Sequence, residues 1–215
     1  MIPPMSILNL FRKNSQGKRE LVLDTEATGL QVSDGHRIVE VAMVEMIGGK
    51  LTGKELHILI NPDRHIPEEV VKIHHIDDEK IKDAPKFKDV AKEIRDFIGD
   101  DQVIITCRTE NGYTLDIDMM NMEFKKAGVK EIPVPQWSNV RRWSEAMWGT
   151  DKARLDKVLD RYGVSRKERD DNGHGALLDA RLLAAVYPAL QKDYVKFQEK
   201  APAPAAKPKD KSPKA

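Results

Sequence analysis

The fold is decided near the N-terminus by the stretch Leu21-Val22-Leu23-Asp24-Thr25-Glu26-Ala27-Thr28-Gly29. Its short apolar run ends in acids, which is typical of a central strand buried on both faces of an α/β sheet. Because side chains on a strand alternate with a period of two, Asp24 and Glu26 share one face. Ligand sites in open α/β sheets favour this end of the strands. Two acids in a turn or at a helix cap would have the same spacing, so the pair alone does not identify a site.

Apolar patterning beyond this strand predicts the remaining elements. Two apolar-rich segments, 37–46 and 51–60, are separated by Gly48-Gly49, which indicates a hairpin. A second short buried strand is expected at 102–106. Helices are expected at 67–73, 87–98, 115–126, 155–162 and 176–191. Three early strands followed by alternating helices and strands predict an α/β fold with a mixed sheet.

Length and composition limit the chain to one globular domain with appendages. The sequence has 215 residues, of which 40% are hydrophobic, and this is enough for a proper core. One cysteine, Cys107, excludes a disulfide framework and a cysteine-based zinc site, and it fits a reducing compartment such as the cytoplasm. No apolar run approaches the roughly 18 residues of a membrane helix, so no membrane association is expected.

The net charge of +1 conceals an uneven distribution along the chain. Residues 1–19 carry +4 and residues 200–215 carry another +4, which leaves −7 on the segment between them. The final Pro/Ala/Lys-rich run contains no large apolar residue, so it cannot bury enough surface to offset its ordering entropy. We therefore expect a basic extension at 1–18, a folded domain at 19–192 and a flexible tail at 193–215. A solubilising linker and a docking arm are both compatible with this tail.

A further acid lies where a core residue is expected. Asp179 shares a helix face with the apolar residues Leu182, Leu183 and Val186. That face points toward the core, and a buried carboxylate is unfavourable unless it is paired or bound to a metal ion. A salt bridge to a buried Arg or Lys and a metal site are both open at this point.

A histidine lies shortly before this acid in the sequence. His174 lies five residues before Asp179, which on a continuous helix would turn the two side chains apart. Gly173 and Gly175 flank the histidine, so we expect a loop that lets it turn toward the same site. Taken alone, a surface loop histidine is equally compatible with the pattern.

The helix expected at 115–126 opens with two acids, Asp116 and Asp118. The positive end of the helix dipole favours acids in the first turn, so neither needs a catalytic role. If one of them joins the other acids, Asp116 and Asp118 are rival candidates.

Together these residues resemble the DEDDh branch of the DEDD superfamily of 3′–5′ exonucleases, and most closely the proofreading epsilon-subunit family of bacterial DNA polymerase III. The family's first motif, Asp-x-Glu-x-Thr-Gly, reads here Asp24-Thr25-Glu26-Ala27-Thr28-Gly29. The third motif, His-x4-Asp, reads His174-Gly175-Ala176-Leu177-Leu178-Asp179. Segments 35–40, 73–76 and 155–162 also match, so the likeness covers about residues 19–190.

The second motif departs from the family pattern. The family has His-Asn-x-x-Phe-Asp just after a strand, whereas residues 105–116 read Ile-Thr-Cys-Arg-Thr-Glu-Asn-Gly-Tyr-Thr-Leu-Asp. This segment is a few residues longer and lacks the His-Asn pair. Matching Leu115-Asp116-Ile117 and Glu123-Phe124 to the family helix favours Asp116 over Asp118.

The resemblance implies a ribonuclease H-like fold with a mixed five-stranded sheet flanked by helices. It also implies that four acids hold two Mg²⁺ or Mn²⁺ ions and that His174 is the general base toward the attacking water. The four acids are Asp24, Glu26, Asp116 and Asp179. Contacts to the terminal nucleotide are expected from Thr28, Gly29, Glu40 and His74.

The expected activity is a metal-dependent 3′–5′ exonuclease that removes nucleoside monophosphates from single-stranded DNA 3′ ends, as proofreading for a replicative polymerase. The expected protein partner is a DNA polymerase catalytic subunit held through the terminal extensions. Two alternatives stay open. One is an exoribonuclease that trims RNA 3′ ends. The other is a non-catalytic polymerase-associated module that docks through Ile7-Leu8-Asn9-Leu10-Phe11 or through the tail.

Overall fold

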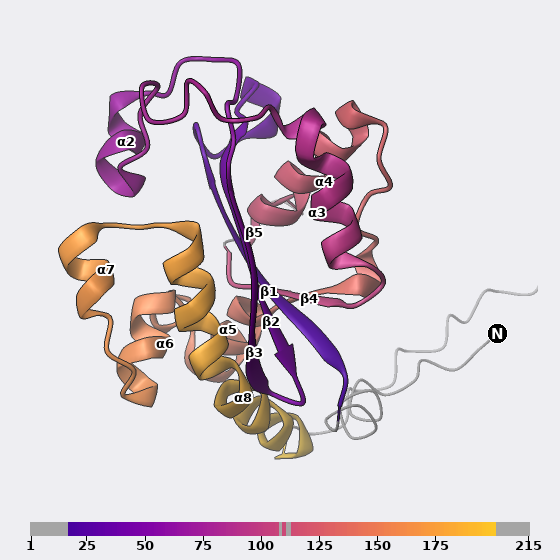
Figure 1. Ribbon diagram of the computed structural model, residues 1–215. Coiled ribbons are helices and arrows are strands. Elements are labelled where there is room, and N and C mark those ends of the chain that lie inside the picture. The colour runs from indigo at the N-terminus through magenta and orange to yellow at the C-terminus, as the bar shows by residue number, and fades with distance from the viewer. Residues whose placement is uncertain (1–16, 108, 111–112, 201–215) are drawn as a thin grey trace, which may run out of the picture.

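A five-stranded mixed sheet lies at the centre of the computed structural model, which describes residues 17–107, 109–110 and 113–200 (Figure 1). The strands are β1 (Arg19–Ala27), β2 (Ile38–Ile47), β3 (Lys50–Leu59), β4 (Gln102–Ile105) and β7 (Trp137–Asn139). Their order is β3-β2-β1-β4-β7, with antiparallel pairing from β1 to β3 and parallel pairing from β1 through β4 to β7. The predicted α/β fold with a mixed five-stranded sheet is confirmed.

Helices cover both faces of this sheet (Figure 1). One face packs against α3 (Phe87–Ile98) and α4 (Leu115–Ala127), and their apolar residues form one buried cluster with β1, β2 and β4. The other face packs against α5 (Val140–Trp148), α6 (Leu155–Tyr162) and α8 (Ala176–Lys200), which form a second cluster. The short helices are α2 (Glu68–His74), α7 (Lys167–Asn172) and the 3-10 turns at Val32–Asp34, Val134–Gln136 and Thr150–Lys152.

The alternation of side chains along β1 decides which helix layer each residue meets. Leu21 and Leu23 belong to the apolar cluster under α3 and α4, whereas Val22 belongs to the cluster under α8. Continuing the same alternation, Asp24 and Glu26 face the side of the sheet that α8 covers. The apolar half of β1 therefore fixes the direction in which its two acids point.

The last helix is longer than the sequence indicated. α8 continues to Lys200, so the expected helix end at Gln191 is wrong. The reason is aromatic packing: Tyr194 stacks on Trp143 of α5 with ring centroids 4.9 Å apart, and Phe197 continues the row. Residues 193–200 of the expected tail thus lie in α8, while residues 1–16 and 201–215 fall outside the described chain. Within the described residues, no helix has the length and apolar character needed to cross a membrane.

The unusually long second motif contains a small hairpin between β4 and α4. Its strands are β5 (Thr109–Glu110) and β6 (Tyr113–Thr114), which pair antiparallel. Residues 108 and 111–112 of this segment lie outside the described chain. Because α4 starts directly after β6, Asp116 and Asp118 both fall in the first turn of the helix.

Candidate active site

The carboxyl end of β1 brings Asp24 and Glu26 to an acidic edge of the sheet. Both side chains are partly exposed, in contrast to the fully buried residues that precede them in the strand. β1 pairs antiparallel with β2, which places Glu26 directly opposite Glu40, and the register shifts after Glu26. Three carboxylates are therefore close together before any helix contributes to the site.

The start of α8 adds Asp179 and His174 to the same edge. Asp179 is 5% exposed, and its Oδ2 lies 3.5 Å from Nδ1 of His174 in the loop before the helix. The His174 side chain is 44% exposed, so it is open to solvent on its outer side. Ligand atoms of Glu26, His174 and Asp179 all lie within 4.8 Å of one another, a spacing compatible with a bound metal ion.

The first turn of α4 supplies Asp116 rather than Asp118. Asp116 is buried, and its Oδ1 accepts a 2.8 Å hydrogen bond from the Thr25 hydroxyl. Its Oδ2 is buried with no hydrogen-bond partner among the described residues. The Asp118 carboxylate instead accepts from the Thr114 backbone N–H, at the start of the helix. Geometry thus separates the two rivals: Asp118 caps its own helix, and Asp116 turns toward β1.

The acids at this edge raise one another's pKa values. The pKa of Asp24 is raised well above its usual range by burial, then by the charges of Asp116, Asp179, Glu26 and Glu40. Burial, followed by the charges of Asp179, Glu40 and Asp116, raises the pKa of Glu26 to about 8.

The pKa of Asp116 is also raised, and here burial is the cause. Burial raises its pKa to about 6, although hydrogen bonds from Thr25 and Cys107 oppose the shift. Burial is thus the largest cause of all three shifts, and the charges of neighbouring acids add to it for Asp24 and Glu26.

The donor set fits a hard divalent cation. Mg²⁺ and Mn²⁺ prefer carboxylate oxygens, and the four acids Asp24, Glu26, Asp116 and Asp179 offer only such oxygens. The Oδ2 of Asp116 is buried without a hydrogen-bond partner among the described residues. Since buried carboxylate oxygens are otherwise hydrogen-bonded or paired, this oxygen fits the role of a cation ligand.

One basic residue that sequence reasoning missed reaches into this group. Arg169 of α7 is 8% exposed, and its Nε donates to Asp179 Oδ1 over 2.5 Å. Its Nη2 lies 2.8 Å from His174 Nδ1, and its Nη1 pairs with Asp156 of α6. The salt bridge that the sequence left open as an alternative for Asp179 is therefore present. It lies beside the acid cluster, which consists of Asp24, Glu26, Asp116 and Asp179. The burial of Arg169 could not be predicted from the sequence, because Arg169 lies in the charged run Arg166-Lys167-Glu168-Arg169-Asp170-Asp171, which is typical of a solvated surface.

Glu40 links the strand acids to the start of α8. Its Oε2 accepts from the backbone N–H of Ala176 over 2.8 Å, at the positive end of the helix. Its Oε1 lies 2.6 Å from Nε2 of His57 on β3. Because both its oxygens are engaged, Glu40 positions the helix that carries Asp179. This role is separate from the nucleotide contact that the resemblance implies.

The other expected nucleotide contacts surround the end of β1. Thr28 is fully buried, and its hydroxyl lies 3.0 Å from His36 Nδ1 and accepts from the Arg37 backbone N–H. Gly29 packs so tightly on the His36 ring that a Cβ there would lie 2.3 Å from it. His74 is 4% exposed, burial lowers its pKa, and its Nδ1 accepts from the Ile76 backbone N–H.

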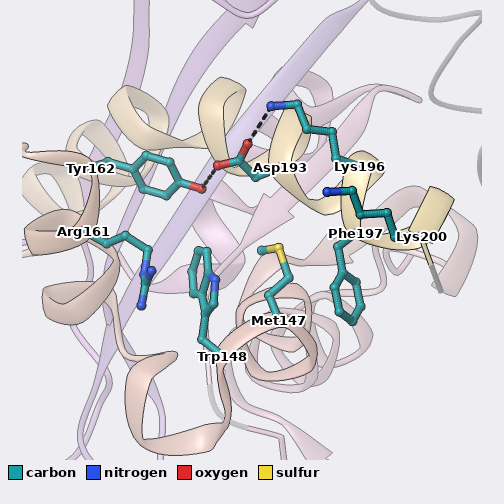
Figure 2. A pocket seen from close by; sticks show the side chains of 8 residues that line it. All are labelled: Met147, Trp148, Arg161, Tyr162, Asp193, Lys196, Phe197 and Lys200. Atoms are coloured by element: carbon teal, nitrogen blue, oxygen red, sulfur yellow. Dashed lines mark hydrogen bonds and ion pairs between the residues drawn. The ribbon is translucent and has the colours of Figure 1, made fainter.

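A hollow lies away from these acids, between α5, α6 and α8 (Figure 2). It has a volume of about 430 Å³. Its single acid, Asp193, accepts from the Tyr162 hydroxyl and pairs with Lys196, so its charge is balanced locally. Arg161 stacks over the Trp148 ring at 4.3 Å. No group of acids converges among the residues that line this hollow, and it offers no counterpart to the edge of β1.

Comparison with known sequences gives one family and several close relatives. The RNase_T model, described as an exonuclease family, matches residues 21–187 and so spans every acid at the edge of β1. The chain is also similar to the DNA polymerase III subunit epsilon of Rickettsia prowazekii. The two are 39% identical over 175 residues, which is 80% of this chain and 73% of that relative.

Comparison with solved structures supports the fold. A 3′-exonuclease solved for its recognition of a histone mRNA stem-loop has a TM-score of 0.66 at 15% identity, covering 86% of this chain and 71% of that one. Exonuclease I of E. coli, solved with a dT13 oligonucleotide, has a TM-score of 0.67 at 14% identity, covering 85% and 43%. Since one of these structures concerns RNA and the other DNA, the shared fold does not choose between the two substrates.

Proposed function

The chain belongs to the RNase_T exonuclease family, in its DNA polymerase III epsilon branch, and on that premise we propose how its residues carry out 3′–5′ exonuclease chemistry. The enzyme removes nucleoside monophosphates from DNA 3′ ends, as proofreading for a replicative polymerase. The observation that supports this best is the convergence of four acids from β1, α4 and α8 with His174 of the loop before α8.

The four acids are the metal ligands of this proposal. Enzymes of this family depend on divalent metal ions, and the excess of unneutralised carboxylate at the edge of β1 fits that requirement. We assign two ions, Mg²⁺ or Mn²⁺, to Asp24, Glu26, Asp116 and Asp179. When bound, such ions supply positive charge to the scissile phosphate and to the leaving oxygen.

His174 is the general base of this proposal. A neutral imidazole accepts a proton near neutral pH, and the exposed loop position gives His174 access to a water beside the phosphate. As that water attacks phosphorus, the proton passes to the imidazole and the bond from phosphorus to the 3′ oxygen of the preceding nucleotide breaks. Asp179, 3.5 Å from His174, stabilises the imidazolium that forms.

The terminal nucleotide is bound around the end of β1. Thr28 and Gly29 are assigned there from the first family motif, and Glu40 and His74 from the matching segments 35–40 and 73–76. Two exposed apolar side chains support a base-binding surface beside them. Leu30, which follows Gly29, is 68% exposed, and Ile73, which precedes His74, is 47% exposed. Exposed apolar side chains beside a polar site provide a surface on which a nucleobase can pack.

The partners follow from the same assignment. The substrate is a single-stranded DNA 3′ end, and the protein partner is a polymerase catalytic subunit that acts with it in the cytoplasm. We assign the basic segment 1–18 and residues 201–215 to partner attachment, and residues 19–200, which include the whole of α8, to the exonuclease domain. The +4 charge of residues 1–19 and the +4 charge of residues 200–215 also attract phosphate without regard to sequence.

The proposed substrate is tested with 5′-labelled primers. DNA and RNA primers of equal sequence, each with a paired or a mismatched 3′ end, are incubated with the full chain in Mg²⁺ or in EDTA. We expect the mismatched DNA end to be shortened fastest, and only with metal. Faster release from RNA would identify an exoribonuclease. No release from any primer would identify a non-catalytic module.

A further inference from the structure

Arg169 brings a positive charge into the acid cluster from a helix that is otherwise exposed. The other described side chains of α7 face solvent, and Arg169 alone among them is buried. Three groups from three different segments surround its guanidinium: Asp179 of α8, His174 of the preceding loop and Asp156 of α6. Arg169 also opposes the rise in the pKa of Glu26, so its charge is felt across the cluster.

This contact occupies one of the two oxygens that Asp179 can offer to a metal ion. Asp179 Oδ1 accepts from Arg169 Nε over 2.5 Å, and Asp179 is 5% exposed, so solvent does not screen the pair. A charge-assisted hydrogen bond of this length is among the stronger hydrogen bonds in proteins. A cation that binds Asp179 must therefore displace the guanidinium or compete with its field.

The same guanidinium also forms a hydrogen bond with His174, the proposed general base. Arginine can only donate, so the 2.8 Å contact between Arg169 Nη2 and His174 Nδ1 makes Nδ1 the acceptor. A neutral imidazole then carries its proton on Nε2, and neither ring nitrogen has a free lone pair. In this arrangement His174 cannot take a proton from water, so the site is inactive while Arg169 holds His174.

We propose that Arg169 is the resident counter-cation of the metal-free site, which a divalent ion displaces from Asp179 and His174. This inference rests on the metal site of the proposed function. Asp156 keeps hold of the displaced side chain, because it lies on α6, outside the acid cluster, and is 35% exposed. A single movement of Arg169 thus opens Asp179 to metal and returns the Nδ1 lone pair to His174. Metal loading and activation of the base then occur together.

The test measures Mn²⁺ binding by calorimetry and melting of the metal-free protein in EDTA, with the full chain. For Arg169→Ala we expect Mn²⁺ to bind about tenfold more tightly, because the competing cation is gone. The same variant should melt at a lower temperature in EDTA, because Asp179 loses its buried partner. Arg166→Ala is the matched control: Arg166 precedes the same helix and pairs with Asp160 and Asp170, away from the cluster, so both quantities should stay unchanged.

Unchanged or weaker Mn²⁺ binding by Arg169→Ala would overturn the inference and make Arg169 a fixed support of Asp179. Should that variant fail to fold, Arg169→Lys decides in its place, because lysine keeps the charge but cannot hold three partners at once. Tighter binding by Arg169→Lys supports displacement, and equal or weaker binding contradicts it. If the wild-type chain binds no more Mn²⁺ than Asp24→Asn, the metal site of the proposed function fails, and this inference fails with it.

Discussion

The carboxylates at the two ends of β1 have pKa values shifted in opposite directions. At the amino end, Arg19 donates to Glu45 of β2 and to Asp101, and the pKa of Glu45 is lowered, chiefly by its hydrogen bond from Arg19. At the carboxyl end, Asp24 and Glu26 meet further acids, and their pKa values are raised. Both ends belong to the same strand and the same sheet. What distinguishes them is the balance of charge around the carboxylates.

This difference shows that a buried acid is by itself a poor sign of function. Glu123 of α4 is 2% exposed, yet both its oxygens accept from Arg37, over 2.5 and 2.7 Å. Such a bidentate pair satisfies the carboxylate and needs no further ligand. An acid group that outnumbers its cations, as at the carboxyl end of β1, is neutralised either by bound protons or by a metal ion.

The largest expected effect comes from removing the central acid. Asp24→Asn should lower the rate of nucleoside monophosphate release by about a thousandfold or more, since several kcal/mol of charge stabilisation is lost. The metal-free variant should melt at a higher temperature than the wild type, because a repelling charge has been removed. Retention of a tenth of the wild-type rate would show that the carboxyl end of β1 is not the catalytic centre.

Replacing the histidine should have a smaller but still large effect. His174→Ala should lower the rate by about a hundredfold or more, the range of general base catalysis. Mn²⁺ binding, followed by calorimetry, should persist because the four acids remain. A variant rate close to that of the wild type at neutral pH would remove His174 from the base role.

Breaking the balanced end of β1 should affect stability and leave the chemistry intact. Arg19→Met deprives Glu45 of its main partner. We expect a loss of about 2 kcal/mol in urea unfolding, less than for a fully buried pair, because Thr52 still donates to Glu45. The rate per folded molecule should match the wild type at a temperature well below melting. A large loss of activity in the folded variant would erase the contrast between the two ends.

The pH dependence of stability gives the smallest effect. Folding raises the pKa of Glu26 from 4.5 to about 8 and that of Asp116 from 3.8 to about 6. At a pH between the unfolded and the folded pKa of each group, the folded chain binds more protons than the unfolded chain. The free energy of unfolding therefore falls as pH rises through this range. The metal-free protein should melt a few degrees lower at pH 8 than at pH 6. Saturating Mg²⁺ should flatten this slope, and a slope that is the same with and without metal would contradict the assignment.

The sequence allowed much of the site to be predicted because regular elements place side chains predictably. Alternation on β1 predicted a shared face for Asp24 and Glu26, and helical spacing predicted a buried Asp179. In each case the fold follows the local pattern, since apolar neighbours fix which way the acid points.

Other features depended on contacts between distant segments. Arg169 lies in a run of charged residues, and only the packing of α7 against α6 and α8 turns it inward. Glu40 could be matched to the family motif, but its bond to the Ala176 backbone joins residues 136 positions apart. The end of α8 at Lys200 depends on the stacking of Tyr194 on Trp143. Local periodicity carries no information about such pairings.

The most direct test of the central claim is anomalous diffraction from crystals soaked in Mn²⁺. The charge imbalance at the carboxyl end of β1 predicts two manganese peaks about 3.5–4 Å apart, ligated by Asp24, Glu26, Asp116 and Asp179. It also predicts that the Arg169 guanidinium has moved off Asp179. Crystals that hold no manganese at these carboxylates at saturating concentration, with Arg169 still bonded to Asp179, would contradict the account.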